Sequence, residues 1–390
     1  MENPKIRFKG FTKDWEQRKF SDIASRESVS RESSYDLPSL EYEDVIAEEG
    51  RLNKDISLKE NIKKGIVFDG SQVLYGKLRP YLHNWLNPDF SGVAVGDWWV
   101  LKPNNADKSF IYRLIQTQRF DDIANKSAGS KMPRADWNLV SNTEFAVPVS
   151  QEEQEKIGEY FSSLDHLITL HQRKCEQTKN LKKYMLQKMF PQNGAKVPEI
   201  RFNGFTHDWE QRKFGSLLEE TRNKTIFEDE DTLLSCAIDG MYLNSELFSH
   251  FRGSSNIGYL KVKKNDLILS AQNLHLGNCN VNLRFEHGII SPAYKVYELV
   301  GCNPLFMQAW VKKDSTKDFF LKSSTEGASV CRKNIVWEEL YKQELPVPSI
   351  EEQTKVGEYF YSLDHLITLH QRKCDELKKM KKFMLQNMFI

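Results

Sequence analysis

The sequence predicts an α/β protein in which two similar globular domains are joined by two long antiparallel coiled-coil helices, arranged as an internal repeat with pseudo-twofold symmetry. The first observation is a duplicated opening, since residues 7–20 read RFKGFTKDWEQRKF and residues 201–214 read RFNGFTHDWEQRKF. The second is a duplicated close, since residues 152–190 recur at residues 351–389 and both copies contain LDHLITLHQRKC. A repeat of about 195 residues is too long for a solenoid, so the repeated unit is a whole domain followed by a helix.

The repeat divides the chain into five segments. We expect a first domain, a first spacer helix, a linker, a second domain and a second spacer helix at residues 1–150, 151–190, 191–200, 201–350 and 351–390. Between the duplicated parts, residues 21–150 and 215–350 resemble each other only weakly. The duplication therefore keeps a frame and lets the enclosed segments diverge, as expected of a protein that reads two different targets with one scaffold.

Bulk composition indicates a large globular protein. The chain has 390 residues, of which 39% are hydrophobic and 28% are charged, which is enough for two cores of ordinary size. The start MENPKIRFKG lacks the apolar run of a signal peptide, no stretch is apolar for long enough to cross a membrane, and the six cysteines form no CxxC pair. We therefore expect reduced thiols and a cytoplasmic location. The net charge of +1 does not decide for or against nucleic acid, because binding depends on where the charges lie.

Helical periodicity marks both repeated C-terminal blocks. Apolar and medium-sized residues step by four and three in the first copy, and the second copy repeats the pattern. The predicted seam of the helix pair consists of Phe161, Leu164, Ile168 and His171 with Phe360, Leu363, Ile367 and His370. Each helix of about 39 residues would be about 58 Å long, and the two copies are the obvious partners for each other in an antiparallel pair.

Two features of these helices have more than one interpretation. His171 with Cys175 and His370 with Cys374 have the i, i+4 spacing of metal ligands, but we interpret them as seam residues and predict no metal site. The second half of each helix is rich in lysine and arginine. This face either is simply solvated or meets phosphates or an acidic partner.

Both enclosed segments have the order strand, polar loop, strand, followed by a short helix and a glycine-led basic turn. The loops are YGKLRPYL at residues 75–82 and SAQNLHLG at residues 270–277, and the basic turns lie at residues 128–137 and 326–335. These segments contain the residue types that contact phosphates and base edges. The sequence lacks HExxH, GxSxG and a correctly spaced P-loop, so we predict binding and no catalysis.

With this frame, the chain resembles the specificity subunit of type I restriction-modification enzymes over nearly its whole length. The resemblance rests on two variable domains, each opened by GFxxDWEQRKF and closed by FAVPVSQEEQ at residues 145–154 or LPVPSIEEQ at residues 345–353, and on the loop YGKLRPYL. It implies a non-catalytic subunit that binds double-stranded DNA sequence-specifically, with two target-recognition domains that each read one half of a bipartite site. The long helices would act as a ruler and dock methyltransferase subunits, two in number.

The resemblance also implies partners and cofactors. Methyltransferase (modification) subunits would methylate adenine at N6 with S-adenosylmethionine, and motor-nuclease (restriction) subunits would cut DNA with ATP and Mg²⁺, so no cofactor is expected in this chain. Two alternatives are a non-catalytic two-domain protein-assembly adaptor and an RNA-binding module.

Equivalent loops of the two repeats supply the candidate DNA-binding residues. We expect Lys77, Arg79, Tyr81, Gln272, Asn273 and His275 at the DNA surface, with Lys131, Arg134, Arg332 and Lys333 mainly on phosphates. For Arg79 and Tyr81, the alternative is a turn that only stabilises the fold. In the second domain SAQNLHLG stands in place of YGKLRPYL, as expected if each domain reads different bases.

Overall fold

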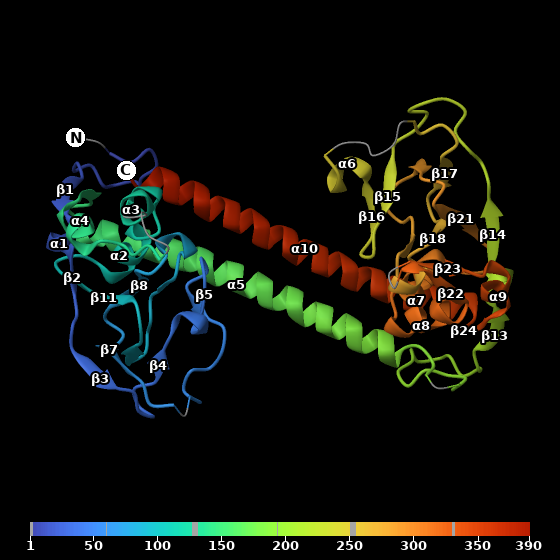
Figure 1. Cartoon of the computed structure of the whole chain (residues 1–390), viewed down its shortest axis with the longest axis horizontal. Coiled ribbons are helices and arrows are strands. Elements are labelled where there is room, and N and C mark those ends of the chain that lie inside the picture. Colours follow the sequence, from blue (N-terminus) through green and yellow to red (C-terminus); the bar gives the residue numbers. More distant parts are fainter. Residues whose placement is uncertain (1–2, 60, 127–131, 193, 250–254, 330–331) are drawn as a thin grey trace. The chain divides into compact units, whose positions relative to one another are not determined.

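The computed structural model describes residues 3–59, 61–126, 132–192, 194–249, 255–329 and 332–390 (Figure 1). The chain divides into two compact units, where unit 1 contains residues 1–172 and 372–390 and unit 2 contains residues 173–371. Each unit holds one α/β domain together with part of each long helix, α5 (Gln151–Lys188) and α10 (Ile350–Met388). The predicted fold class of two similar α/β domains with two long helices is confirmed.

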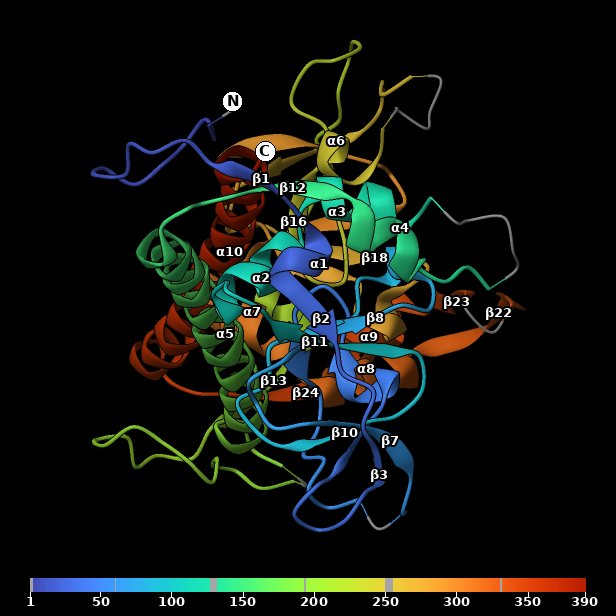
Figure 2. The ribbon, with the colours of Figure 1, turned by 90° about the vertical axis from the view of Figure 1, so that its left-hand side faces the viewer.

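Unit 1 is built around two four-stranded sheets within its described residues. One sheet has the order β2-β11-β8-β9, with bounds Ala24–Arg26, Trp98–Pro103, Val73–Gly76 and Trp85–Leu86. The other has the order β3-β7-β10-β4, with bounds Ser30–Glu32, Lys64–Phe68, Gly92–Ala94 and Ser39–Leu40. Two short pairs join β1 (Glu16–Lys19) to β12 (Glu144–Val147) and β5 (Val45–Ile46) to β6 (Arg51–Leu52). The short helices α1 (Phe20–Ile23), α2 (Lys108–Leu114), α3 (Gln118–Ala124) and α4 (Trp137–Asn142) gather at the end of the unit away from the second sheet (Figure 2).

Unit 2 repeats this plan with variations. Its main sheet has the order β14-β21-β18-β19, with bounds Leu218–Thr221, Tyr294–Leu299, Leu267–Ser270 and Cys279–Val281. The two-stranded pairs are β13 (Glu210–Lys213) with β24 (Glu344–Val347), β15 (Leu234–Cys236) with β16 (Met241–Leu243), β17 (Leu260–Lys263) with β20 (His287–Ile290), and β22 (Ser324–Ser329) with β23 (Arg332–Ile335). The short helices are α6 (Asn244–Leu247), α7 (Pro304–Val311), α8 (Asp314–Lys322) and α9 (Trp337–Lys342). The main sheet corresponds strand by strand to β2-β11-β8-β9 of unit 1, and both are antiparallel.

Local sequence explains where these elements begin. Strand β8, VLYG, is buried along its whole length, as expected of a central strand covered on both faces. The side chains of Asp107, Thr117 and Asp136 accept hydrogen bonds from the first turns of α2, α3 and α4, which satisfies amide groups that have no partner within the helix. In unit 2, Asn303 caps α7 in the same way.

The two long helices run antiparallel within each unit. In unit 1, Lys381 lies 2.7 Å from Asp165, and the Phe161 and Phe389 rings lie 6.2 Å apart. Unit 2 repeats both contacts at equivalent positions, where Lys182 bonds Asp364 at 2.5 Å and the Phe190 and Phe360 rings lie 6.0 Å apart. Of the predicted seam, Phe161, Leu164, Ile168, Phe360 and Leu363 are buried, whereas His171, Ile367 and His370 are partly exposed.

The repeated sequence frame forms the joint between each domain and its helix. In unit 1, the buried Glu153 carboxylate accepts two hydrogen bonds from Arg7, from Nε at 2.6 Å and from Nη2 at 2.8 Å. The next residue, Gln154, accepts from the Asp107 amide at 2.9 Å and donates to the Pro148 carbonyl at 2.8 Å. The EEQ motif is therefore where the N-terminal segment, helix α2 and helix α5 meet.

Unit 2 contains the same joint. Arg201 donates to Glu352 from Nε and Nη2, both at 2.7 Å, while Gln353 accepts from the Asn303 amide at 2.8 Å and donates to the Pro348 carbonyl at 2.9 Å. Gly357 of helix α10 lies so close to α7 that an added Cβ would be 2.6 Å from the Leu305 Cβ. These contacts explain physically why this part of the repeat is nearly identical in the two copies.

A buried carboxyl group in unit 2 predicts a pH-dependent stability. Asp266 is 4% exposed, and burial raises its pKa to about 6 although its Oδ2 accepts a hydrogen bond from the Lys263 amide. Because the folded pKa exceeds the unfolded value of about 3.9, the folded state holds the proton more tightly, and stability falls as pH rises from about 4 to about 6. We expect Asp266→Asn to be more stable than the wild type at pH 7 by about 1–3 kcal/mol, with the difference disappearing near pH 4. Urea unfolding of both proteins across this range checks the prediction, and a difference that does not change with pH would contradict it.

Candidate nucleic-acid interface

In unit 1, two segments far apart in the sequence form one surface. Strand β8 leads into the short 3₁₀ helix η2 (Pro80–Leu82), and Arg79 between them has a positive φ of 50°. The Arg79 amide donates to the Pro133 carbonyl at 2.7 Å, and the Ala135 amide donates to the Lys77 carbonyl at 2.8 Å. Backbone hydrogen bonds therefore join the loop 77–82 to residues 133–135. The structure brings together Lys77, Arg79 and Arg134 from the predicted set.

A carboxylate that the sequence analysis did not single out organises the charges of this surface. Asp97 lies in the turn between β10 and β11 and accepts from Arg134, from Nε at 3.2 Å and from Nη2 at 3.0 Å. Lys77 Nζ lies 3.5 Å from the same carboxylate. The hydrogen bond from Arg134 lowers the pKa of Asp97, so this carboxyl group is ionised at neutral pH. Two of the three cations in this group therefore share one anion.

Tyr42 fixes the backbone beneath that ion pair. Its hydroxyl donates to the Asp97 carbonyl at 2.5 Å and accepts from the Leu78 amide at 3.1 Å. Burial raises the pKa of this hydroxyl, which keeps it protonated and able to donate. Tyr42 begins the 3₁₀ helix η1 (Tyr42–Asp44), so the position of η1 determines the position of the candidate DNA-reading loop.

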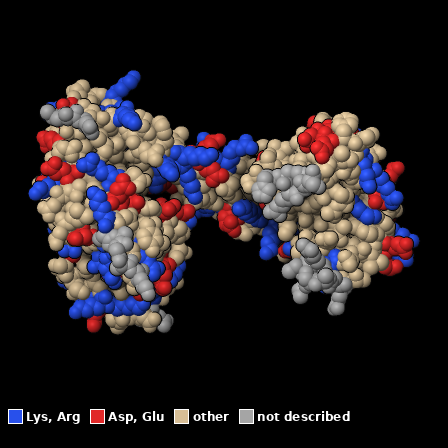
Figure 3. Space-filling model, turned by 45° about the horizontal axis from the view of Figure 1, so that its top comes forward, with Lys and Arg blue, Asp and Glu red and all other residues tan. Residues whose placement is uncertain are grey.

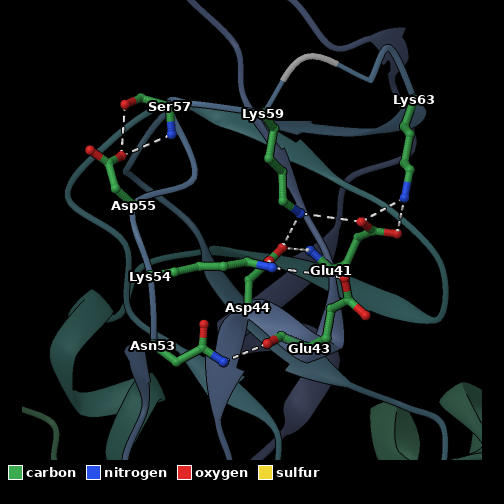
Figure 4. Close-up of polar contacts among 9 residues, drawn as sticks. All are labelled: Glu41, Glu43, Asp44, Asn53, Lys54, Asp55, Ser57, Lys59 and Lys63. Carbon is green, nitrogen blue, oxygen red and sulfur yellow. Dashed lines mark hydrogen bonds and ion pairs between the residues drawn. The ribbon is translucent and has the colours of Figure 1, made fainter.

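A lysine–carboxylate network holds η1 in turn (Figure 4). Asp44 is fully buried and accepts from Lys59 Nζ at 2.5 Å, while Lys54 Nζ lies 3.0 Å from its other oxygen. Lys63 Nζ bonds both oxygens of Glu41 at 2.7 Å. Burial alone would raise the pKa of Asp44, but the hydrogen bond from Lys59 and the further contacts outweigh it and the pKa is lowered. Lys54, Lys59 and Lys63 are thereby tied to the element that carries Tyr42.

Around the loop lie an exposed aromatic ring and a histidine. Tyr81 is exposed, and its contact with DNA stays a prediction. His83 stacks on Trp85 with ring centroids 5.2 Å apart, and its ring nitrogens lie 3.3 Å from Glu48 and 3.0 Å from Asp121. These contacts anchor the far end of η2.

In unit 2, the equivalent loop also meets the segment that follows the short helices. Strand β18 leads into the 3₁₀ helix η4 (Leu274–Leu276), and the Lys333 amide donates to the Gln272 carbonyl at 3.3 Å. Gln272 is exposed, and Asn273 and Lys333 are partly exposed. Arg332 begins strand β23, but its side chain is outside what the structure describes, and Lys131 lies outside the described residues altogether.

His275 differs from the expectation of a surface residue. It is only 9% exposed, and neither ring nitrogen has a hydrogen-bond partner among the residues that the structure describes. Burial lowers its pKa, so the ring is neutral. The turn of η4 directs His275 inward and leaves Leu276 exposed, which is the reverse of what the polarity of the two residues suggests.

The register of the two main sheets shows where the domains differ. In unit 1, Trp98 is paired with Gly76, and the Lys77 amide donates to the Asp97 carbonyl at 2.9 Å. In unit 2, Tyr294 is paired with Ser270, and the Ala271 amide donates to the Ala293 carbonyl at 3.0 Å. Lys77 and Asp97 therefore correspond to Ala271 and Ala293. A charged pair in one domain is replaced by two methyl groups in the other.

The long helices carry a second repeated surface. Lys and Arg side chains gather over α5 and α10 in the space-filling view (Figure 3). The same two helices also carry large apolar side chains that are 40% to 54% exposed at equivalent positions of the repeat. These are Leu167, Met380 and Phe383 in unit 1 and Leu366, Leu181 and Tyr184 in unit 2. Exposed apolar groups that recur on a helix face are typical of a surface for another protein.

The rest of the described chain offers little else of chemical interest. No group of three or more His, Cys, Asp or Glu side chains suited to a metal ion occurs among the described residues. Within the same residues, no helix has the length and apolar character needed to span a membrane. Cys175, Cys236, Cys279, Cys302 and Cys374 are free, buried thiols.

Comparisons with known proteins agree on one family. Residues 12–180 match the family described as type I restriction modification DNA specificity domain. The type I restriction enzyme MjaVIII specificity subunit of Methanocaldococcus jannaschii is 23% identical over 297 residues, which cover 71% of this chain and 68% of that protein.

Solved structures share the fold. The crystal structure of a type I restriction-modification system S subunit from M. genitalium matches with a TM-score of 0.65 at 13% identity and covers 100% of this chain and 99% of its own. A chain from a structural study of complex assembly and conformational transition of the type I R-M system matches with a TM-score of 0.50 at 16% identity, over 96% of this chain and 97% of its own. At these identities the structural matches show the fold alone.

Proposed function

We propose that this chain, which is a type I restriction-modification specificity subunit, reads a bipartite double-stranded DNA site with its two α/β domains and directs partner subunits to it. The observation that carries the proposal is that the two domains share one construction. Each has the same joint to its helix and a pair of loops joined by backbone hydrogen bonds, while the side chains on those loops differ. Base edges in the major groove are distinguished by the side chains that reach them, so two divergent loop pairs on one frame are suited to two different half-sites.

The chemistry would belong to the partners. We propose that methyltransferase subunits with S-adenosylmethionine methylate adenine at N6, that motor-nuclease subunits with ATP and Mg²⁺ restrict unmodified DNA, and that this chain is non-catalytic and cytoplasmic. Support comes from the sequence, which lacks the common catalytic motifs, and from free thiols at the five described cysteines. The proposed role of α5 and α10 is to set the number of unspecified base pairs between the half-sites.

Binding by the chain with its co-purified methyltransferase tests this function. In a gel shift with equal concentrations of double-stranded DNA and double-stranded RNA, we expect a shifted DNA band that survives a large excess of random DNA only when the probe contains the site. Preferential binding to RNA would support the RNA-binding alternative. Stable binding of the methyltransferase without any DNA preference would support the assembly adaptor.

The repeated apolar positions on the helices are the proposed docking surfaces for two methyltransferase subunits. Replacing Leu181 and Tyr184 by Asp puts two charges into one surface, and replacing Met380 and Phe383 by Asp does so in the other. Because a buried unpaired charge strongly opposes association, we expect each double variant to bind one methyltransferase subunit and the quadruple variant to bind none.

Native mass spectrometry of the co-expressed complexes counts the bound subunits. Ile226→Asp is the matched control, because Ile226 is 80% exposed but does not lie on either long helix. This control should keep two methyltransferase subunits. Double variants that also keep two would show that the partner docks elsewhere.

A further inference from the structure

The ion pair between Arg134 and Asp97 changes what this arginine can recognise. Its side chain is 51% exposed, and two of the five N–H groups of the guanidinium bond the Asp97 carboxylate. By themselves these two groups carry no net charge, and Lys77, whose Nζ lies 3.5 Å from the same carboxylate, brings the group of three to a net charge of +1. A DNA phosphate that approached Arg134 would come close to the Asp97 anion, and the repulsion would offset its attraction to the guanidinium.

A guanine edge does not suffer this repulsion. In the major groove guanine presents two neutral acceptors, O6 and N7, which a guanidinium binds with two parallel hydrogen bonds. Such recognition is favoured when the plane of the guanidinium is fixed before DNA arrives, because a mobile arginine must lose side-chain freedom on binding. The two hydrogen bonds to Asp97 fix that plane.

The support beneath Asp97 is itself rigid. Its carbonyl accepts from the Lys77 amide at 2.9 Å and from the Tyr42 hydroxyl at 2.5 Å, and the preceding Gly96 has a φ of 94°, which other residues rarely adopt. Tyr42 is in turn held through η1 by the network of Asp44 and Glu41 with three lysines. The backbone of Asp97 is therefore held at a set position relative to the loop 77–82, and the carboxylate projects from this fixed backbone toward Arg134 and Lys77.

We propose that Arg134 reads a guanine in the half-site of the first domain and that Asp97 is the positioning residue that orients it. This inference rests on the proposed DNA-reading role of the loop surface. It departs from the expectation that Arg134 contacts mainly phosphates. The second domain has Ala293 at the position of Asp97 and Ala271 at the position of Lys77, so this device belongs to one half-site only.

The salt dependence of binding distinguishes base reading from phosphate contact. The chain with its methyltransferase is titrated with DNA containing the wild-type site and with sites substituted at each position in turn, at several salt concentrations. For Arg134→Ala, we expect the preference for one guanine of the first half-site to fall by roughly 5- to 150-fold, the discrimination that one bidentate contact supplies. The slope of log K against log salt should stay nearly constant, because no phosphate contact is lost.

Asp97→Asn gives the opposite signature. Removing the anion leaves the charges of Arg134 and Lys77 without the opposing charge of Asp97, so affinity for random DNA should rise and the salt slope should steepen by about 0.9 for each of the two cations that meets a phosphate. The preference for the same guanine should fall, because the guanidinium is no longer oriented. Lys333→Ala in the second domain is the control, and it should leave the preference for the guanine of the first half-site unchanged.

Several results would overturn the inference. Equal weakening on all sequences by Arg134→Ala, with the salt slope reduced by about 0.9, would make Arg134 a phosphate contact. A first half-site without a guanine, or an unchanged preference in the Arg134 variant, would remove it from base reading while the proposed function stood. Only the absence of sequence preference in the wild type would count against that function.

Discussion

Replacing Arg7 by alanine is expected to destabilise unit 1 by about 3 kcal/mol, because it leaves a buried carboxylate without its counter-charge. Glu153 is 1% exposed, and its strongest partners are the two guanidinium nitrogens of Arg7 at 2.6 and 2.8 Å. After the substitution, the indole of Trp15, at 3.3 Å, is the remaining side-chain donor to Glu153 among the described residues. One neutral hydrogen bond does not compensate a buried negative charge.

The internal repeat provides the matched experiment. Arg201→Ala removes the same partner from Glu352, which is also 1% exposed, so it should destabilise unit 2 by a similar amount. Hydrogen exchange read by mass spectrometry separates peptides of residues 1–172 from those of residues 173–371, and each variant should lose protection in its own unit. Lys342→Ala is the control, because its ion pair with Glu339 is exposed and exposed ion pairs contribute little to stability. If Arg7→Ala behaves like this control, the joint does not hold the domain on its helix.

Exchanging residues 21–148 for the corresponding segment of a relative is expected to change the first half-site completely and to leave the second half-site and the spacer unchanged. The exchanged segment carries the loop 77–82, Asp97 and Arg134. The retained frame supplies Arg7, Glu153 and Gln154, and Gln154 needs only backbone groups from the incoming segment, the amide at position 107 and the carbonyl at position 148. The incoming domain should therefore form the same contacts with Gln154 of the retained helix as the original domain.

Sequencing of N6-methyladenine in cells that carry the exchanged chain with its methyltransferase reads the result. The matched exchange of residues 215–348 should change only the second half-site. Alteration of both halves by either exchange would mean that the two domains do not read DNA independently.

The parts of this fold that the sequence predicts are those whose pattern repeats. The duplicated frame and the four-and-three spacing of Phe161, Leu164 and Ile168 indicate two domains and a paired helix, because such periodicity follows directly from helix geometry. The proposed function class follows from the same frame, and the specificity-domain family and the MjaVIII specificity subunit are similar to this chain.

The organisation of the loop surface could not be predicted in the same way. Asp97 stands inside GVAVGDWWVLKP, which reads as one strand, and only the Gly-Asp step hints at the turn that the structure contains. Loop 77–82 is joined to residues 133–135 by backbone hydrogen bonds, and no side-chain pattern in the sequence predicts them. His275 is polar, yet the turn of η4 buries it, because tertiary packing overrides the preference of a single residue.

N6-methyladenine sequencing of a methylation-free host that expresses the methyltransferase with and without this chain tests whether the two domains select the DNA site. We expect methylation at a motif of two specified half-sites separated by a fixed number of unspecified base pairs, present only when this chain is expressed. Methylation that does not depend on the chain, or that occurs at a single continuous motif, would contradict the claim that its two domains select the DNA site.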